Sequence, residues 1–180
     1  MPKDMKLAIS EAFLEMIRHG NVDKITVKSL IEECHVSRQT FYYHFQDILD
    51  VMEWSIQRET ERLVEKSLKV GDIHSALLIF ISFTVEGYQV LQKLLQSQRR
   101  REVEKFLIDS IETYLTAMAK LGDQNCAVNI ADGKVLLRYN AWGLVGVLLE
   151  YAGKPDLDKE RLASQLERIL SGELLEWKQP

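Results

Sequence analysis

Polar side chains near the N-terminus carry the clearest chemical signal in the sequence. Arg38, Gln39 and Thr40 follow one another, and Tyr43 comes about one helical turn later. In the major groove of DNA, a guanidinium suits guanine, a carboxamide suits adenine and a threonine methyl group suits thymine. These four residues are therefore candidates to contact base edges, and Arg38 and Gln39 are the first choice.

A second group of residues suits phosphate oxygens. Thr26 and Ser37 are good helix N-cap residues, and the N–H groups at a helix N-terminus point outward beside the positive end of its dipole. Lys28 adds a positive charge, and Tyr42 and His44 add hydrogen-bond donors in the same region. We expect these five residues to contact the DNA backbone.

The same segment contains residues with a purely structural interpretation. Phe41 and Phe45 are four residues apart, so they share one helix face and belong to the core whatever the function. For Tyr42, packing as a surface aromatic is the alternative to DNA contact.

Three short helices are predicted to position these side chains. An apolar stripe indicates the first helix, and Gly20 is expected to end it in the left-handed conformation. The second helix follows Thr26, and the third follows Ser37 after a tight link. This arrangement is typical of a helix-turn-helix. Asp47 then caps a long fourth helix over residues 47-70. The stripe of the first helix is Ile9, Ala12, Phe13, Met16 and Ile17.

Two runs in this region resemble the DNA-binding signature of TetR-type transcriptional regulators. They are Ile25-Thr26-Val27-Lys28-Ser29-Leu30 and Val36-Ser37-Arg38-Gln39-Thr40-Phe41-Tyr42-Tyr43-His44-Phe45. The resemblance implies an all-α fold with a helix-turn-helix DNA-binding domain over residues 1-46. It also implies a helical effector-binding and dimerisation domain over residues 47-180, in which 47-70 is a linking helix. A homodimer, paired through its last two long helices, would bind a palindromic double-stranded DNA operator as a repressor.

The sequence departs from the family pattern at two positions. His35 stands where many members have the glycine of the turn, and a non-glycine residue at positive φ is uncommon. Ile48 stands where many members have a lysine that contacts phosphate. We therefore expect a slightly different turn, and either a lower affinity for DNA or a weaker dependence of that affinity on salt.

The C-terminal part of the chain has the composition of a helical core. Residues 73–95 are strongly apolar, another helix is predicted over 99–121, and a polar loop follows at 122–125. Residues 135–151 are apolar nearly all round, which predicts burial on more than one side. Gly143 and Gly146 would let another helix approach closely there, and a final amphipathic helix offers a second surface.

An effector, either a small molecule or a protein, would bind this second domain. Five residues are candidates to contact it, although aromatic residues at helical spacing are more often core, and an exposed Arg138 is an equal alternative. The run Arg138-Tyr139-Asn140-Ala141, taken with Arg38 to Tyr42, is also similar to a subgroup that contains dihydroxyacetone kinase operon regulators. There a protein can be the effector. The candidates are Phe83, Tyr114, Arg138, Tyr139 and Trp142.

Composition restricts the other function classes. The 180 residues are 46% hydrophobic with a net charge of -4, and residues 1–46 carry six basic and six acidic side chains, so charge alone does not indicate DNA binding. No apolar run approaches the roughly 18 residues that span a bilayer, so a cytoplasmic protein without a membrane partner is expected. Cys34 and Cys126 lack metal-ligand spacing and are interpreted as buried apolar residues.

Two further functional hypotheses compete with DNA-binding regulation. Residues 1–46, called the head below, carry no net charge, and Ile48 removes one expected phosphate contact. These two features leave open a helical protein-interaction adaptor with little DNA affinity. An enzyme is not expected, because the four histidines form no ligand motif and no glycine-rich phosphate loop or nucleophile motif occurs. We accordingly expect no cofactor and no metal.

Overall fold

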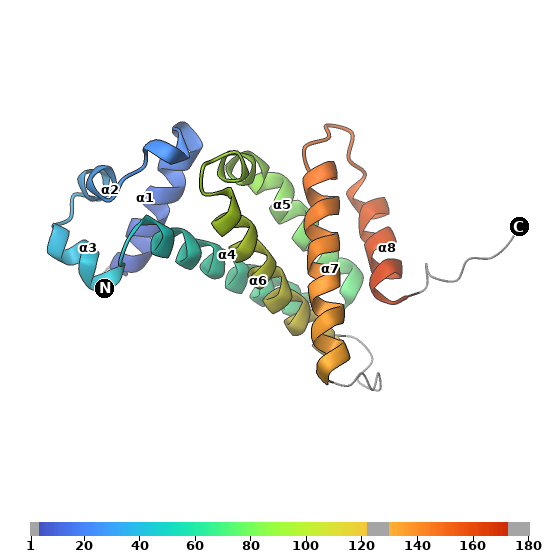
Figure 1. The fold of residues 1–180 in the computed structure, drawn as a ribbon. Helices are drawn as coiled ribbons and strands as arrows, with labels where there is room; N and C mark the ends of the chain where they lie inside the picture. Colours follow the sequence, from blue (N-terminus) through green and yellow to red (C-terminus); the bar gives the residue numbers. More distant parts are fainter. Residues whose placement is uncertain (1–3, 122–129, 173–180) are drawn as a thin grey trace, which may run out of the picture. The chain divides into compact units, whose positions relative to one another are not determined.

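A computed structural model of the chain describes residues 4–121 and 130–172 (Figure 1). Within those two ranges every regular element is helical and no strand occurs, so the predicted all-α fold is confirmed. The elements are α1 (Met5–His19), η1 (Val22–Lys24), α2 (Val27–Cys34), α3 (Arg38–His44), α4 (Ile48–Val70), α5 (Ile73–Leu95), α6 (Arg100–Met118), η2 (Ala119–Leu121), α7 (Ile130–Tyr151) and α8 (Lys159–Leu170).

The helices form two compact units. Unit 1 consists of Met1–Glu59 with Gln89–Leu107, and unit 2 consists of Thr60–Tyr88 with Ile108–Pro180. The long helices α4, α5 and α6 therefore each contribute residues to both units. Each unit joins two separate segments of the chain. The functional division into residues 1-46 and 47-180 stays a prediction.

The core of unit 1 lies between α1, α2, α3 and the first part of α4. Ser10 and Ser55 bring a polar contact into this core, with their hydroxyl oxygens 2.7 Å apart. The Ser55 hydroxyl also donates to the Val51 carbonyl at 2.7 Å, so both side chains are satisfied although buried. Residues at the end of α5 and the start of α6 join these four helices around one apolar centre. Its buried residues are Ile9, Phe13, Ile17, Val22, Ile25, Leu30, Phe41, Phe45, Ile48, Val51, Met52, Leu94 and Val103.

The core of unit 2 is centred on two aromatic rings. Phe80 on α5 and Tyr114 on α6 stack with their centroids 4.8 Å apart and an interplanar angle of 15°. Buried faces of α7 and α8 complete the core around them. These faces carry Ala141, Leu144, Leu148, Leu162, Ala163 and Leu166.

Gly20 ends α1, as predicted, but the expected left-handed conformation was wrong. Its backbone is extended, with φ −131° and ψ −170°. A Cβ atom at this position would lie 2.9 Å from the carbonyl oxygen of Met16. Glycine is needed here because the chain passes close to the end of α1.

The membrane expectation applies most directly to α5. Among the residues that the structure describes, α5 is the one helix long and apolar enough, by length and composition, to cross a bilayer, with a mean hydropathy of 1.3. Polar residues interrupt α5, so it contains no uninterrupted apolar run of that length, and the value of 1.3 is an average over 18 residues. The core helix of a water-soluble protein passes the same test, and α5 buries Ala76, Phe80 and Ile81 in the core of unit 2.

Three other expectations have different outcomes. Cys34 is half-buried, less than expected, and its burial raises the pKa of its thiol. The helix predicted over 99–121 is confirmed as α6 and η2. The predicted loop at 122–125 and Cys126 lie outside the described residues.

Candidate nucleic-acid interface

The N-terminus of α2 is fixed by a reciprocal pair of side-chain contacts. The Thr26 hydroxyl accepts from the Ser29 N–H at 3.1 Å, and the Ser29 hydroxyl accepts from the Thr26 N–H at 2.9 Å. Each side chain thus satisfies an N–H group that the helix leaves without a partner. Lys28 points outward in the same turn and lies 3.9 Å from the Glu32 carboxylate. Because its side chain is 74% exposed, Lys28 can reach an anion outside the protein.

His35 closes α2 in the left-handed conformation, with φ 53° and ψ 39°. Its N–H donates to the Glu32 carbonyl at 3.2 Å, and the Val36 N–H donates to the Ile31 carbonyl at 3.2 Å. This pair of bonds defines a Schellman motif, whose left-handed position is usually glycine. His35 therefore occupies this left-handed position although its side chain makes the conformation unfavourable.

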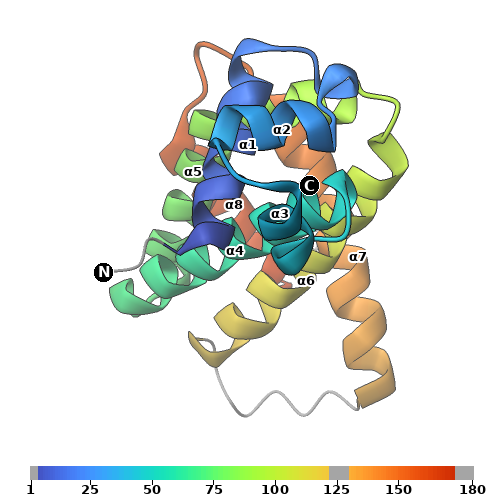
Figure 2. The ribbon, with the colours of Figure 1, turned by 90° about the vertical axis from the view of Figure 1, so that its left-hand side faces the viewer.

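The short helix α3 begins at Ser37 and buries one of its faces. The Ser37 hydroxyl accepts from the Thr40 N–H at 3.0 Å and lies 2.8 Å from the Thr40 hydroxyl. Phe41 is fully buried and Phe45, which caps the C-terminus, is 1% exposed. The core role predicted for both phenylalanines is confirmed. With these anchors, the opposite face of α3 points away from the unit 1 core (Figure 2).

The outward face of α3 combines cationic, amide and phenol groups. Arg38 and Gln39 are exposed, as are Tyr42 (59%) and Tyr43 (84%). The Tyr42 ring contacts Phe41 edge-on, with centroids 5.4 Å apart, so Tyr42 has a defined direction although it is exposed.

His44 and Thr40, the two other residues predicted on α3, are half-buried. The Tyr43 ring meets His44 edge-on at 5.0 Å. The nine predicted DNA-contact residues thus lie on α2, on α3 and at the N-caps of these two helices, which suits a surface that contacts both phosphates and bases.

The departure at Ile48 has a structural reason. This side chain is 5% exposed and packs in the core of unit 1 at the start of α4. The predicted cap of α4 is confirmed, because the Asp47 carboxylate accepts from the Asp50 N–H at 3.0 Å.

Sequence reasoning did not single out Lys6, on the first turn of α1. Its ammonium nitrogen lies 5.1 Å from the centroid of the Phe45 ring and 5.6 Å from that of Trp54. The contact joins residues far apart in sequence, so no local pattern could have indicated it.

The five effector-contact candidates do not come together at one place. Tyr114 is 1% exposed, and its hydroxyl donates to the Ala76 carbonyl at 3.0 Å and lies 3.0 Å from the Ser67 hydroxyl. Burial raises the pKa of Tyr114 to about 12. Tyr114 is therefore part of the core of unit 2. In contrast, Tyr139 (73%) and Trp142 (52%) are exposed on α7.

Arg138 is also exposed on α7, and its polar partners are acidic side chains. One guanidinium nitrogen donates to the carboxylates of Asp109 and Glu112 on α6, both at 3.0 Å. These two carboxylates raise the pKa of Arg138. Arg138 is therefore exposed, as in the alternative to effector contact, and its partners are acidic side chains of the same chain.

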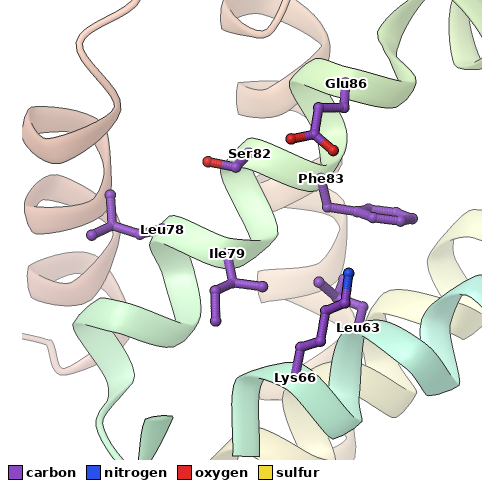
Figure 3. A pocket seen from close by; sticks show the side chains of 7 residues that line it. All are labelled: Leu63, Lys66, Leu78, Ile79, Ser82, Phe83 and Glu86. Atoms are coloured by element: carbon purple, nitrogen blue, oxygen red, sulfur yellow. The ribbon is translucent and has the colours of Figure 1, made fainter. Parts of the chain in front are cut away.

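Phe83 lines a groove between α4 and α5 in unit 2 (Figure 3). The groove has a volume of about 340 Å³ and is mainly apolar. The ammonium group of Lys66 and the carboxylate of Glu86 lie at its border (Figure 3). Of the residues that line the groove, Phe83 is the one that was among the predicted effector contacts. The lining is Leu63, Lys66, Leu78, Ile79, Ser82, Phe83 and Glu86.

The sequence was compared with protein-family models and with known proteins. No protein-family model matches the sequence. The chain is 20% identical, over 92% of its own length and 88% of the relative's, to the HTH-type dhaKLM operon transcriptional activator DhaS of Lactococcus lactis.

Solved structures with the same fold include three regulators. A dihydroxyacetone kinase operon activator DhaS has a TM-score of 0.67 and 19% identity, covering 96% of this chain and 97% of that one. A tetR-family transcriptional regulator from Streptomyces coelicolor has a TM-score of 0.64 and 14% identity, covering 94% and 82%. The fatty acid degradation regulator FadR from Bacillus halodurans has a TM-score of 0.57 and 18% identity, covering 97% and 98%.

The chain therefore has the fold of TetR-family transcriptional regulators, and the resemblance seen in the sequence is confirmed at this level. DhaS, from the subgroup suggested by Arg138-Tyr139-Asn140-Ala141, is among the structures that share it.

Proposed function

We propose that this chain is a sequence-specific, DNA-binding transcriptional regulator that binds a palindromic operator as a homodimer in the cytoplasm. The observation that carries the proposal is the two-sided character of α3. Phe41 and Phe45 are buried, while Arg38, Gln39 and Tyr43 are exposed on a helix capped by Ser37. That arrangement suits a helix that enters a major groove.

The balanced charge of the head is compatible with this function. Acidic residues of the head lie partly on other faces; Glu15, for example, contacts Arg18 and His19 on α1. Local geometry can therefore present N–H groups and cations to phosphates without a net basic excess.

Dimerisation would give two copies of α3 the spacing of about 34–36 Å that one turn of DNA requires. The outer face of α7 is the proposed contact, because Val135 (71%), Tyr139 and Trp142 are exposed there. Gly143 and Gly146 follow on the same face, and nothing lies within 4 Å of the place where their Cβ atoms would be. Such a surface accommodates a second helix closely.

An effector would act on unit 2, and the groove of Figure 3 supports a small apolar ligand. A protein effector is the second candidate, because the exposed aromatic face of α7 also suits a protein surface. Between repression and activation of transcription, we propose repression, in which the bound protein occupies promoter DNA. The relative DhaS is named an activator, so a promoter–reporter fusion with and without the gene is the deciding measurement.

The test of DNA binding is selection of duplexes from a randomised library by the wild-type protein, followed by titration of variants. Arg38→Ala and Tyr42→Ala should each weaken binding to the selected duplex about 10- to 100-fold. Lys105→Ala, an exposed cation on α6, is the matched control and should bind as the wild type does.

If the wild-type protein selects no duplex above random DNA, the regulator proposal fails. The adaptor hypothesis would then account better for the chain.

A further inference from the structure

Unit 1 contains a second attachment of the three-helix head, separate from α4. It is formed by the end of α5 and the turn between α5 and α6, at Lys93, Gln98 and Arg99. These residues contact the end of α1 and the connection between α1 and α2.

Lys93 supplies the strongest of these contacts. Its ammonium nitrogen donates to the carbonyl oxygens of Ile17 at 2.9 Å and Arg18 at 2.6 Å, and lies 3.4 Å from that of Gly20. The last carbonyls of a helix have no partner within it, and they form the negative end of its dipole. Lys93 therefore caps the C-terminus of α1 with a charge and with hydrogen bonds.

Two neighbouring contacts extend this attachment toward α2. The Asp23 carboxylate accepts from the Gln98 N–H at 3.0 Å, and the Arg99 guanidinium donates to the Val22 carbonyl at 3.5 Å. Apolar packing supports them, because Val22 is buried in the same core as Leu94 and Val103. The segment that leads to Thr26, the cap of α2, is thus held by residues far along the chain.

From these contacts we infer that Lys93 is a positioning residue for DNA binding, which fixes α1 and thereby α3, because both helices bury residues in the core of unit 1. This inference rests on the function proposed above. Phe13 on α1 and Phe41 on α3 share the core of unit 1, so a displacement of α1 displaces the support of α3. Lys93, which binds backbone carbonyls of its own chain and not DNA, would thus control the affinity for DNA.

Lys93 lies on α5, the helix that also lines the groove of unit 2. Most residues that line the groove of unit 2, from Leu78 to Glu86, belong to α5. A ligand in that groove would contact α5, and Lys93 near the end of α5 caps the C-terminus of α1. Lys93 is therefore a position at which a change in α5 can reach the head.

The experiment compares Lys93→Met, Lys93→Gln and Lys93→Arg with the wild type. Methionine keeps an apolar stem but cannot cap, glutamine keeps two N–H donors without charge, and arginine keeps both charge and donors. Lys105→Met removes the same charge at an exposed site and is the control. Circular dichroism and urea unfolding establish which variants are folded.

The first measurement is hydrogen–deuterium exchange of backbone amides in peptides covering residues 15–26. We expect roughly tenfold faster exchange in Lys93→Met, an intermediate rate in Lys93→Gln, and wild-type rates in Lys93→Arg and Lys105→Met. Unchanged exchange in both Lys93→Met and Lys93→Gln overturns the capping role.

The second measurement is titration with the duplex that the wild-type protein selects, at several salt concentrations. Lys93→Met should bind about tenfold more weakly with an unchanged slope of log affinity against log salt, because Lys93 releases no counterion from DNA. A slope smaller by about one makes Lys93 a phosphate contact and overturns the inference, as does wild-type affinity in a folded Lys93→Met.

The two proposals fail in different ways. If the wild-type protein selects no duplex, the DNA-binding function fails and the positioning role for DNA fails with it. If the wild type selects a duplex and folded Lys93→Met binds it equally well, the DNA-binding function stands and the inference about Lys93 is wrong.

Discussion

The helices α3 and α7 both expose aromatic side chains, yet their surroundings differ. On α3, Tyr42 and Tyr43 stand beside Arg38 and Gln39. On α7, Trp142 lies beside glycines. Exposed phenols among hydrogen-bonding groups suit nucleic acid, whereas exposed rings on a smooth apolar face suit another protein helix.

The comparison shows that exposure of an aromatic ring does not by itself define a partner. On α3 the buried Phe41 fixes the helix and contacts the Tyr42 ring, so polar side chains are held on the opposite face. On α7 the buried face, with Leu144 and Leu148, leaves the outer face free for association. The neighbours of the exposed ring distinguish the two surfaces.

The largest effect is expected from the two faces of α3. Phe41→Ala removes a fully buried ring and should lower the free energy of unfolding by about 3–5 kcal/mol. Tyr42→Ala, at the adjacent exposed position, should change it by less than about 1 kcal/mol while weakening DNA binding. Urea unfolding measures both variants. Equal losses of stability would mean that Tyr42 is a core residue.

The second prediction concerns the outer face of α7. Trp142→Arg places a charge in the proposed dimer contact and should raise the dimer dissociation constant by at least about 30-fold. Tyr151→Ala, an exposed aromatic at the end of the same helix, is the control and should leave association unchanged. Analytical ultracentrifugation measures both. A wild-type protein that is monomeric at micromolar concentration contradicts the dimer proposal.

A smaller effect is expected from the turn before α3. His35→Gly relieves a left-handed conformation and should raise the free energy of unfolding by about 0.5–1 kcal/mol. His19→Gly, at a helical position of α1, should lower it. Thermal unfolding distinguishes them, and a destabilised His35→Gly would show that the imidazole contributes contacts of its own.

The smallest expected effect is a pH dependence within unit 2. The Nε2 atom of His74 lies 3.1 Å from the Glu160 carboxylate, and Nδ1 lies 3.1 Å from that of Glu167. Hydrogen bonds to Glu160 and then Glu167 raise the pKa of His74, and Asp72 is a further acidic neighbour.

The sign follows from protonation of His74. Only the imidazolium donates from both nitrogens, so its stabilisation is complete below the pKa of a free histidine. It is lost as the pH rises through the higher pKa of the folded state. The urea midpoint of the wild type, relative to His74→Gln, should therefore fall between mildly acidic and mildly alkaline pH. A difference that is constant with pH would refute this, and His19→Gln provides the control for an exposed histidine.

Local sequence patterns predicted most of the helices and the candidate DNA-contact residues of α2 and α3. The caps at Thr26, Ser37 and Asp47 involve residues three positions apart, so their contacts are contained in the sequence. The family resemblance indicated a turn at His35, but the left-handed conformation of this residue was established by the structure. The candidate effector contacts were less successful, because helical spacing cannot distinguish a buried Tyr114 from an exposed Trp142.

The sequence by itself determined the helices, their caps and the buried and exposed faces of α3, because these depend on interactions within one or two helical turns. Tertiary structure alone decided where Lys93 and Arg138 find their partners, and that the groove beside Phe83 exists. Those features join residues tens of positions apart, and only the packing of the folded chain brings them within contact distance.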